Sequence, residues 1–226
     1  MIKWAYIIFV GCCILSCGKD DNTTPMNFYD TYFPLSSGVY VDYHVREIIH
    51  DELASNPHDT SIYFLRTQIS DTVIDNQGRL AYKFMRLTRM DTTDTWEISD
   101  VWTTIRNNNN IELTEENQRK VKLVLPPNNF TIWDANAYNT LNTMNCFYED
   151  IHQPFSINSF NFDSTIKVQQ EDVLNLVSYR KKYEIYANHV GLIQKYYKDL
   201  VISNFDTLNI SSGIELIYNC IDFGVE

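Results

Sequence analysis

The stretch V-Y-V-D-Y-H-V-R, from Val39 to Arg46, decides the fold class. Its odd-numbered residues are apolar or aromatic, and its even-numbered residues include an aspartate, a histidine and an arginine. Successive side chains of an extended chain point to opposite faces, so a period of two gives one apolar face and one polar face. The stretch therefore predicts a β-strand that is buried on one face.

The same alternation returns along the rest of the chain at short spacing. The stretches that carry it are Ser61–Ile69, Arg79–Leu87, Trp96–Arg106, Lys120–Leu125, Ser178–Tyr186, Leu192–Leu200 and Ile214–Phe223. Residues typical of turns separate several of them, namely Asp75–Gly78, Asn107–Asn110 and His189–Gly191. Between the first two strands, Glu47–Thr60 is expected to be a loop, with a turn at Asn56 and Pro57.

Many antiparallel strands at short spacing predict one all-β domain over residues 32–226. The pattern does not separate a curved sheet, a half-open barrel and a sandwich. Helix is expected only as a turn or two, near Asp172–Val177 or Glu184–Asn188. The composition agrees with a β-rich fold, since aromatic residues make up 14% of the chain and only 7 residues are glycine.

Residues 1–16 have the composition of a secretory signal peptide. Lys3 is the only charge, and the apolar run Trp4–Leu15 follows it. This run is shorter than the roughly 20 apolar residues that a membrane-spanning helix needs. We therefore expect a helical signal peptide that is cleaved, rather than a buried element of the body or a permanent membrane anchor.

The end of this segment, Ile14-Leu15-Ser16-Cys17, resembles the lipobox of bacterial lipoproteins. The resemblance implies that the signal is removed before Cys17, and that Cys17 is acylated on its sulfur and on its new amino group. Leu15 departs from the pattern, which more often has a small residue at that position. Several acyl chains anchor a protein stably, because each buried methylene contributes about 0.8 kcal/mol.

Behind the cysteine, Lys19-Asp20-Asp21 resembles the export signal of surface lipoproteins in Bacteroidetes. The resemblance implies a lipid-anchored protein of the outer membrane that faces outward. The alternative is that residues 17–31 are an ordinary polar tether and that the body faces the periplasm. The outward-facing location is the favoured hypothesis.

Phrases of the body also resemble a family of uncharacterised Bacteroidetes lipoproteins. They are Y-F-P-L-S-S-G (32–38), L-P-P-N-N-F-T-I-W-D-A-N-A-Y-N (125–139), Y-A-N-H-V-G-L-I-Q-K-Y-Y (186–197) and I-Y-N-C-I-D-F-G (217–224). The chain departs from the family around Trp133, where Gly often precedes the tryptophan and Asn-Gly often follows it. The resemblance implies a strand-rich body and no known catalytic residue.

The charge of the chain bounds its partners. The formal net charge is −11, and an acidic surface repels both nucleic-acid phosphates and anionic lipid head groups. We expect no nucleic-acid partner, and contact with the outer membrane through the N-terminal lipid.

Sequence motifs of catalysis do not appear. There is no nucleophile elbow, no H-E-x-x-H, no P-loop and no dinucleotide fingerprint. The carboxylate pairs Glu115-Glu116 and Glu171-Asp172 are expected to be surface charge. We therefore expect no enzymatic activity, no catalytic residue and no cofactor.

Potential metal ligands are densest at His50-Asp51-Glu52 and His58-Asp59. Ligand spacing without converging geometry is poor support for a metal site, so these residues are expected to be a solvated loop. His152 is expected to be a structural histidine, although it could line a pocket.

Two residue types leave alternatives open. Cys146 and Cys220 either form a disulfide, which an exported protein can keep, or remain as free buried thiols. Trp96, Trp102 and Trp133 are expected in the core, with sugar stacking as the alternative, strongest for Trp133 in its loop.

The sequence favours a non-catalytic binding or structural module on the cell surface, whose partner is a glycan, another protein or an apolar ligand. The alternative function is a carrier or chaperone on the periplasmic face, which holds an apolar ligand in the concave side of a curved sheet.

Overall fold

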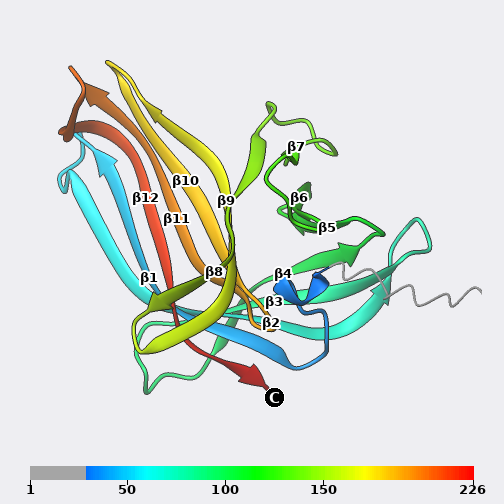
Figure 1. The fold of residues 1–226 in the computed structure, drawn as a ribbon. Coiled ribbons are helices and arrows are strands. Elements are labelled where there is room, and N and C mark those ends of the chain that lie inside the picture. Colours follow the sequence, from blue (N-terminus) through cyan, green and yellow to red (C-terminus); the bar gives the residue numbers. More distant parts are fainter. Residues whose placement is uncertain (1–28) are drawn as a thin grey trace, which may run out of the picture.

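The computed structural model describes residues 29–226, which form one antiparallel sheet of twelve strands that is nearly closed into a barrel (Figure 1). The predicted signal peptide (1–16), Cys17 and the Lys19-Asp20-Asp21 motif lie outside the described residues. The all-β, antiparallel fold class is confirmed, and of the three open architectures the structure has the barrel-shaped sheet.

The strands follow one another along the chain with short connections. They are β1 (Val39–Asp51), β2 (His58–Ile74), β3 (Leu80–Arg89), β4 (Glu97–Arg106), β5 (Asn110–Glu115), β6 (Gln118–Val124), β7 (Ile132–Asp134), β8 (Asn145–Ile157), β9 (Phe160–Leu174), β10 (Ser178–Ala187), β11 (Gly191–Ser203) and β12 (Asp206–Val225). A short 3₁₀ helix, η1 (Asp30–Tyr32), precedes them. No helix in residues 29–226 is long and apolar enough to span a membrane.

The order of strands in the sheet is β6-β5-β4-β3-β2-β1-β12-β11-β10-β9-β8-β7. Each half of the chain is thus a meander of sequential hairpins, and the two halves join where β1 pairs with β12. That pairing runs from Val39 opposite Val225 to Asp51 opposite Ser212. The two edge strands, β6 and β7, meet on the far side of the barrel, and we call this junction the seam.

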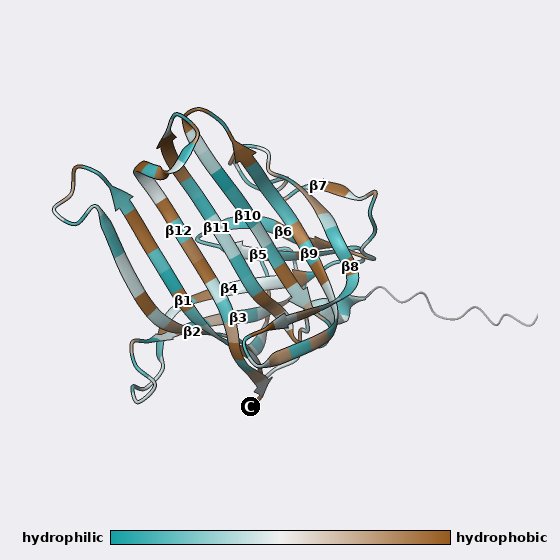
Figure 2. Ribbon diagram, turned by 60° about the vertical axis from the view of Figure 1, so that its left-hand side comes forward, coloured by the Kyte–Doolittle hydropathy of each residue, from teal (hydrophilic) through white to brown (hydrophobic). Residues whose placement is uncertain are grey.

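The alternation that starts at Val39 is confirmed as β1. Val41, Tyr43 and Val45 are all buried in the core, and Figure 2 shows hydrophilic and hydrophobic residues alternating along β1 and β12.

Gly213 of β12 lies so close to β11 that a Cβ there would stand 2.2 Å from the Asp199 carbonyl oxygen.

The predicted loop at Glu47–Thr60 is wrong, because β1 continues to Asp51 and β2 already begins at His58. The buried face changes within this part of the strand: Ile48 and His50 are 6% exposed, whereas Ile49 between them is 49% exposed. The break in the alternation hid the second half of the strand from the sequence pattern.

Strands β5, β7, β8 and β9 were not predicted. In β8 the register shifts between Glu149 and Phe155, and Asp150 and His152 have positive φ, so no regular period of two remains. The predicted helical turn at Asp172–Val177 is also wrong, since β9 extends to Leu174 and a turn follows it. The other suggested turn, at Glu184–Asn188, lies largely within β10.

The β8–β9 hairpin folds back onto the sheet. Phe160 and Phe162 of β9 pack against Phe223 of β12, with ring centroids 5.3 and 5.6 Å apart. Ile157, at the end of β8, belongs to the same buried cluster. The hairpin therefore covers apolar surface beside the C-terminal strand.

The segment before β1 packs on one end of the barrel. Asp30 forms an ion pair with Arg106 at the end of β4, and the Thr31 carbonyl accepts a hydrogen bond of 2.8 Å from the His189 amide in the β10–β11 turn. Tyr32 is 1% exposed. Residues 29–31, expected in the tether, are thus in contact with the body.

Candidate ligand pocket inside the barrel

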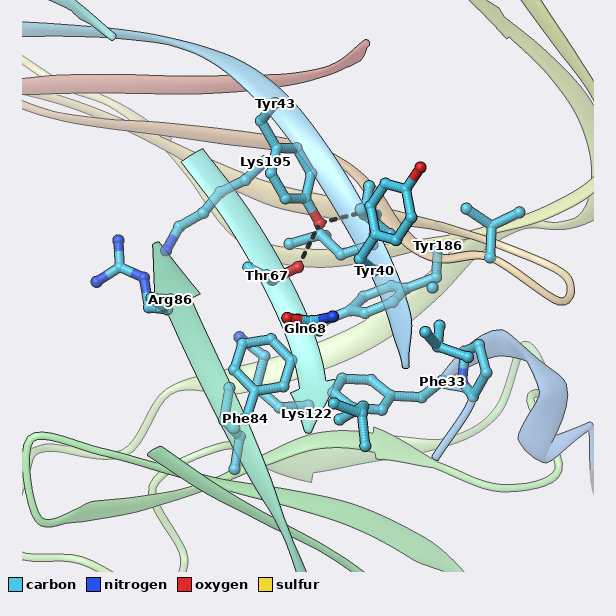
Figure 3. A pocket seen from close by; sticks show the side chains of 18 of the residues that line it. Phe33, Tyr40, Tyr43, Thr67, Gln68, Phe84, Arg86, Lys122, Tyr186 and Lys195 are labelled. Carbon is cyan, nitrogen blue, oxygen red and sulfur yellow. Dashed lines mark hydrogen bonds between the residues drawn. The ribbon is translucent and has the colours of Figure 1, made fainter. Parts of the chain in front are cut away.

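A pocket lies inside the barrel, between strands β1, β10 and β11 on one side and β3 to β6 on the other (Figure 3). It offers about 70 Å³ to the centres of water-sized molecules, whereas one buried water needs about 10–15 Å³ in this measure. The pocket therefore has room for several waters or for a small ligand.

Aromatic rings form a continuous apolar wall in this pocket. The ring centroid of Phe33, just after η1, lies 6.2 Å from that of Phe84 of β3 and 6.2 Å from that of Tyr186 of β10. Phe84 in turn stacks on Trp102 of β4, with centroids 6.2 Å apart and the rings 8° from parallel. Stacked rings of this kind are held by burial and by ring electrostatics, so the wall is fixed by residues of four separate segments.

Charged side chains form a cluster beside this wall. The Lys122 ammonium lies 2.7 Å from a Glu184 carboxylate oxygen and 3.6 Å from one of Glu115, and Lys120 lies 2.9 Å from the other Glu115 oxygen. Lys195 of β11 attracts both carboxylates electrostatically. We call these residues the interior charge cluster: Glu115, Lys120, Lys122, Glu184 and Lys195.

Two carboxylates and one lysine of this cluster, Glu115, Glu184 and Lys122, are held in their charged forms. Burial raises the pKa of Glu115, but the positive charges of Lys122, Lys195 and Lys120 together outweigh it and hold the pKa at about 2. Lys122 and Lys195 also lower the pKa of Glu184 against its burial. Burial lowers the pKa of Lys122, yet the two carboxylates raise it overall. Glu115, Glu184 and Lys122 are therefore all charged at neutral pH.

Hydrogen bonds from tyrosines position the pocket wall. Tyr186 donates to Glu184 over 2.5 Å, and the Tyr43 hydroxyl donates to the Leu192 carbonyl over 2.7 Å. Burial raises the pKa of both phenols well above the ordinary value. Both tyrosines therefore stay neutral and act as fixed hydrogen-bond donors.

Two cationic side chains, Arg86 and Lys195, lie at the end of the pocket away from Phe33 (Figure 3). The Arg86 guanidinium lies 4.5 Å from the centre of the Trp102 ring, pairs with Asp100 over 2.8 Å and donates to the Tyr218 hydroxyl over 3.3 Å. The Lys195 ammonium lies 5.4 Å from the centre of the Tyr218 ring. In Figure 3, Arg86 and Lys195 lie toward one end of the pocket and Phe33 toward the other.

The suggested metal ligands do not converge. His50 Nδ1 and His58 Nδ1 lie 2.8 Å apart, and His50 Nε2 lies 3.2 Å from Glu215, so the two ring nitrogens of His50 have different partners. Within residues 29–226, no three His, Cys, Asp or Glu side chains are grouped so that they could hold a metal ion.

The cysteines are two free, buried thiols in the structure. Cys146 belongs to the core cluster with Trp133 and Tyr148, and Cys220 belongs to the cluster with Tyr43. Of the two alternatives left open by the sequence, the structure has the free thiols and not the disulfide.

The tryptophans have three different positions. Trp133 is 8% exposed and donates from Nε1 to the Val121 carbonyl over 3.1 Å, so it does not offer a free ring face to a sugar. The Trp96 ring makes cation–π contacts with Arg66 and Arg89, whose guanidinium carbons lie 5.0 and 4.3 Å from the ring centre. Trp102 alone among these three lines the pocket.

The sequence interpretation missed the members of the interior charge cluster. Glu115 was expected on the surface, but its side chain is 13% exposed. A signal was present at Lys122, which stands between the buried Val121 and Leu123. A charged residue inside an apolar strand of a closed sheet has apolar neighbours on one face and must find a counter-charge on the other.

His152 accepts or donates a hydrogen bond of 2.6 Å with Tyr32 and lies outside the pocket lining.

Comparison of the chain with protein-family models, with curated proteins and with solved structures finds no match.

Proposed function

We propose that the chain is a lipid-anchored lipoprotein of the cell envelope, exposed on the cell surface, whose barrel binds a small amphipathic molecule without transforming it. The observation that carries the binding function is the pocket itself. It combines a wall of aromatic rings with a few converging polar groups, which is the usual composition of a small-molecule site.

The charges of the pocket support binding rather than catalysis. A general acid or base that works near neutral pH needs a pKa shifted toward 7. Here the pKa of Glu115 is shifted down to about 2 and that of Glu184 is also lowered. Their protons are therefore unavailable at neutral pH, and the paired charges serve to shape the site.

The anchor and the location follow from the resemblance of Ile14–Cys17 to a lipobox and of Lys19-Asp20-Asp21 to a surface-export signal. A carrier on the periplasmic face is the second candidate, and the apolar part of the pocket favours it equally. The two candidates share the ligand site and differ in the side of the membrane.

Protease treatment of intact cells tests the location. The wild type should be digested, and the variant Lys19→Ala/Asp20→Ala/Asp21→Ala should be protected while it still labels with a radioactive fatty acid at Cys17. A Cys17→Ala variant is the control that loses the lipid. If the wild type is protected, the periplasmic carrier replaces the surface protein.

Tryptophan fluorescence tests the pocket. We expect octan-1-ol, a neutral apolar probe, to change the emission of the purified full-length protein, because Trp102 lines the site. Trp102→Phe should lose this response, whereas Trp96→Phe, whose ring is covered by Arg66 and Arg89, should keep it. A response that survives in Trp102→Phe would place the binding elsewhere.

A further inference from the structure

The interior charge cluster carries one ammonium group more than it has carboxylates. Lys122 pairs with Glu184 and Glu115, and Lys120 pairs with Glu115. The Lys195 side chain has no ion pair or hydrogen bond among residues 29–226, and its interactions are a cation–π contact with Tyr218 and longer-range attraction to Glu115 and Glu184. The nearby Arg86 is balanced by Asp100. Counted over the cluster and the Arg86–Asp100 pair, the formal charge is plus one in a chain of net charge −11, and Lys120, whose side chain is 28% exposed, lies outside the pocket lining.

A second unused donor lies beside Lys195. The Tyr218 hydroxyl oxygen accepts a hydrogen bond from Arg86 over 3.3 Å, so its own hydrogen points elsewhere. Tyr218 is 7% exposed and lines the pocket, and within the described part of the chain its hydroxyl has no acceptor. A buried hydroxyl without an acceptor is unfavourable, so the site is arranged to receive one.

These donors stand at a defined end of the pocket. Arg86 contacts the Trp102 ring and donates to the Tyr218 hydroxyl, and the Lys195 ammonium lies 5.4 Å from the centre of the Tyr218 ring. The aromatic wall leads from there to Phe33 at the far end (Figure 3). A molecule that fits has one acceptor-rich, negatively charged end and an apolar remainder.

We propose that the ligand is an amphipathic monoanion, in the first place a monocarboxylate, whose head group accepts hydrogen bonds from the Lys195 ammonium and the Tyr218 hydroxyl. Its apolar part lies along Phe84 toward Phe33. A single negative charge matches the single uncompensated ammonium, and a carboxylate has the two oxygens that two donors require. The Lys195 ammonium and the Arg86 guanidinium at this end repel a cation. This inference rests on the proposed binding function of the same pocket.

Isothermal titration of the full-length protein with three probes of equal chain length tests the inference. Octanoate should bind about tenfold or more tightly than octan-1-ol, and octyltrimethylammonium should not bind. In Lys195→Met the preference for octanoate over octan-1-ol should disappear while octan-1-ol binds as before. Tyr218→Phe should lower the affinity for octanoate alone.

Two variants guard against a loss that comes from unfolding. Lys195→Arg keeps the charge and should keep the preference for octanoate. Lys83→Met is the matched control, because Lys83 is on β3 beside Phe84, is 43% exposed and pairs with Asp71 at the surface over 3.5 Å. It should bind both probes like the wild type.

The outcomes separate the two claims. Equal binding of octanoate and octan-1-ol by the wild type, or an unchanged preference in Lys195→Met, would overturn the monoanion and leave the pocket as a site for neutral molecules. Failure of every probe to bind would overturn the proposed function and the inference with it. Octyl sulfate in place of octanoate tells a carboxylate preference from a general preference for monoanions.

Discussion

The Tyr148 hydroxyl on β8 accepts a hydrogen bond of 2.9 Å from the Val124 amide on β6 and donates one of 2.7 Å to the Val124 carbonyl. One side chain thus satisfies both backbone groups of an edge-strand residue, which a neighbouring strand would otherwise do. The Val121 amide donates to the Ala135 carbonyl over 2.9 Å beside it. The seam is therefore closed by specific contacts and not by a continuous ladder.

Replacing Tyr148 by Phe should weaken this seam. The substitution keeps the ring but leaves the amide and carbonyl of Val124 without partners, and an unsatisfied buried polar group costs about 1–3 kcal/mol. We expect the free energy of unfolding in urea to fall by that amount. Tyr138→Phe, at an exposed position, should leave it unchanged. Equal stability of Tyr148→Phe and wild type would mean that the seam is held by packing alone.

Removing one partner of the Lys122–Glu184 pair should be costly. Lys122→Met leaves Glu184, whose side chain is 3% exposed, without its nearest counter-charge, and breaking a buried pair in this way costs about 3–5 kcal/mol. The double variant Lys122→Met/Glu184→Gln should recover much of the loss in urea denaturation. Lys181→Met, which breaks the exposed pair with Asp172, should cost less than about 1 kcal/mol.

Acid should destabilise the barrel through Glu115. Its pKa is lowered from 4.5 to about 2 in the folded state, so its contribution is complete above pH 4.5 and is lost as the pH falls toward 2. A shift of this size corresponds to about 3 kcal/mol. Glu115→Gln should be less stable at pH 7, and its free energy of unfolding should fall less between pH 4.5 and 2. The exposed Glu97→Gln should follow the wild-type profile.

Neither buried cysteine should react while the protein is folded. Burial raises the pKa of the Cys146 and Cys220 thiols to about 12, and only the thiolate reacts with alkylating agents. Iodoacetamide should label both positions only after denaturation, as read by mass spectrometry of the peptides. Recovery of a peptide in which the two cysteines are joined would contradict the free thiols.

The sequence predicted the fold class because the first strand alternates cleanly. The alternation from Val39 to Val45 survives in the structure, since one face of β1 is buried along that length. It fails where the buried face of a strand changes, as at Ile48 and His50 with the exposed Ile49 between them, or where the register shifts, as in β8. Closure into a barrel depends on how far the sheet curls, and no local pattern records that.

The candidate site was less predictable than the fold. Lys122 and Glu184 are far apart in sequence, and their pairing over 2.7 Å exists only because the sheet curls β6 toward β10. Trp102 was identified as a core or stacking residue, and it lines the pocket. The role of Tyr218 could not be read from the sequence, because it depends on which group Arg86 reaches.

The strand order places the β1–β12 pair and the seam between β6 and β7 on opposite sides of the barrel. The end of β12 lies beside the start of β1, where the Glu226 amide donates to the Gly38 carbonyl over 2.9 Å, and the β1–β12 pair is one of the most extensively paired places in the sheet. The ladder is interrupted on the opposite side, between β6 and β7, which residues 125–131 link. A circularly permuted body, with Glu226 joined through a linker to residue 29 and new ends opened within 127–131, would therefore retain every strand pair.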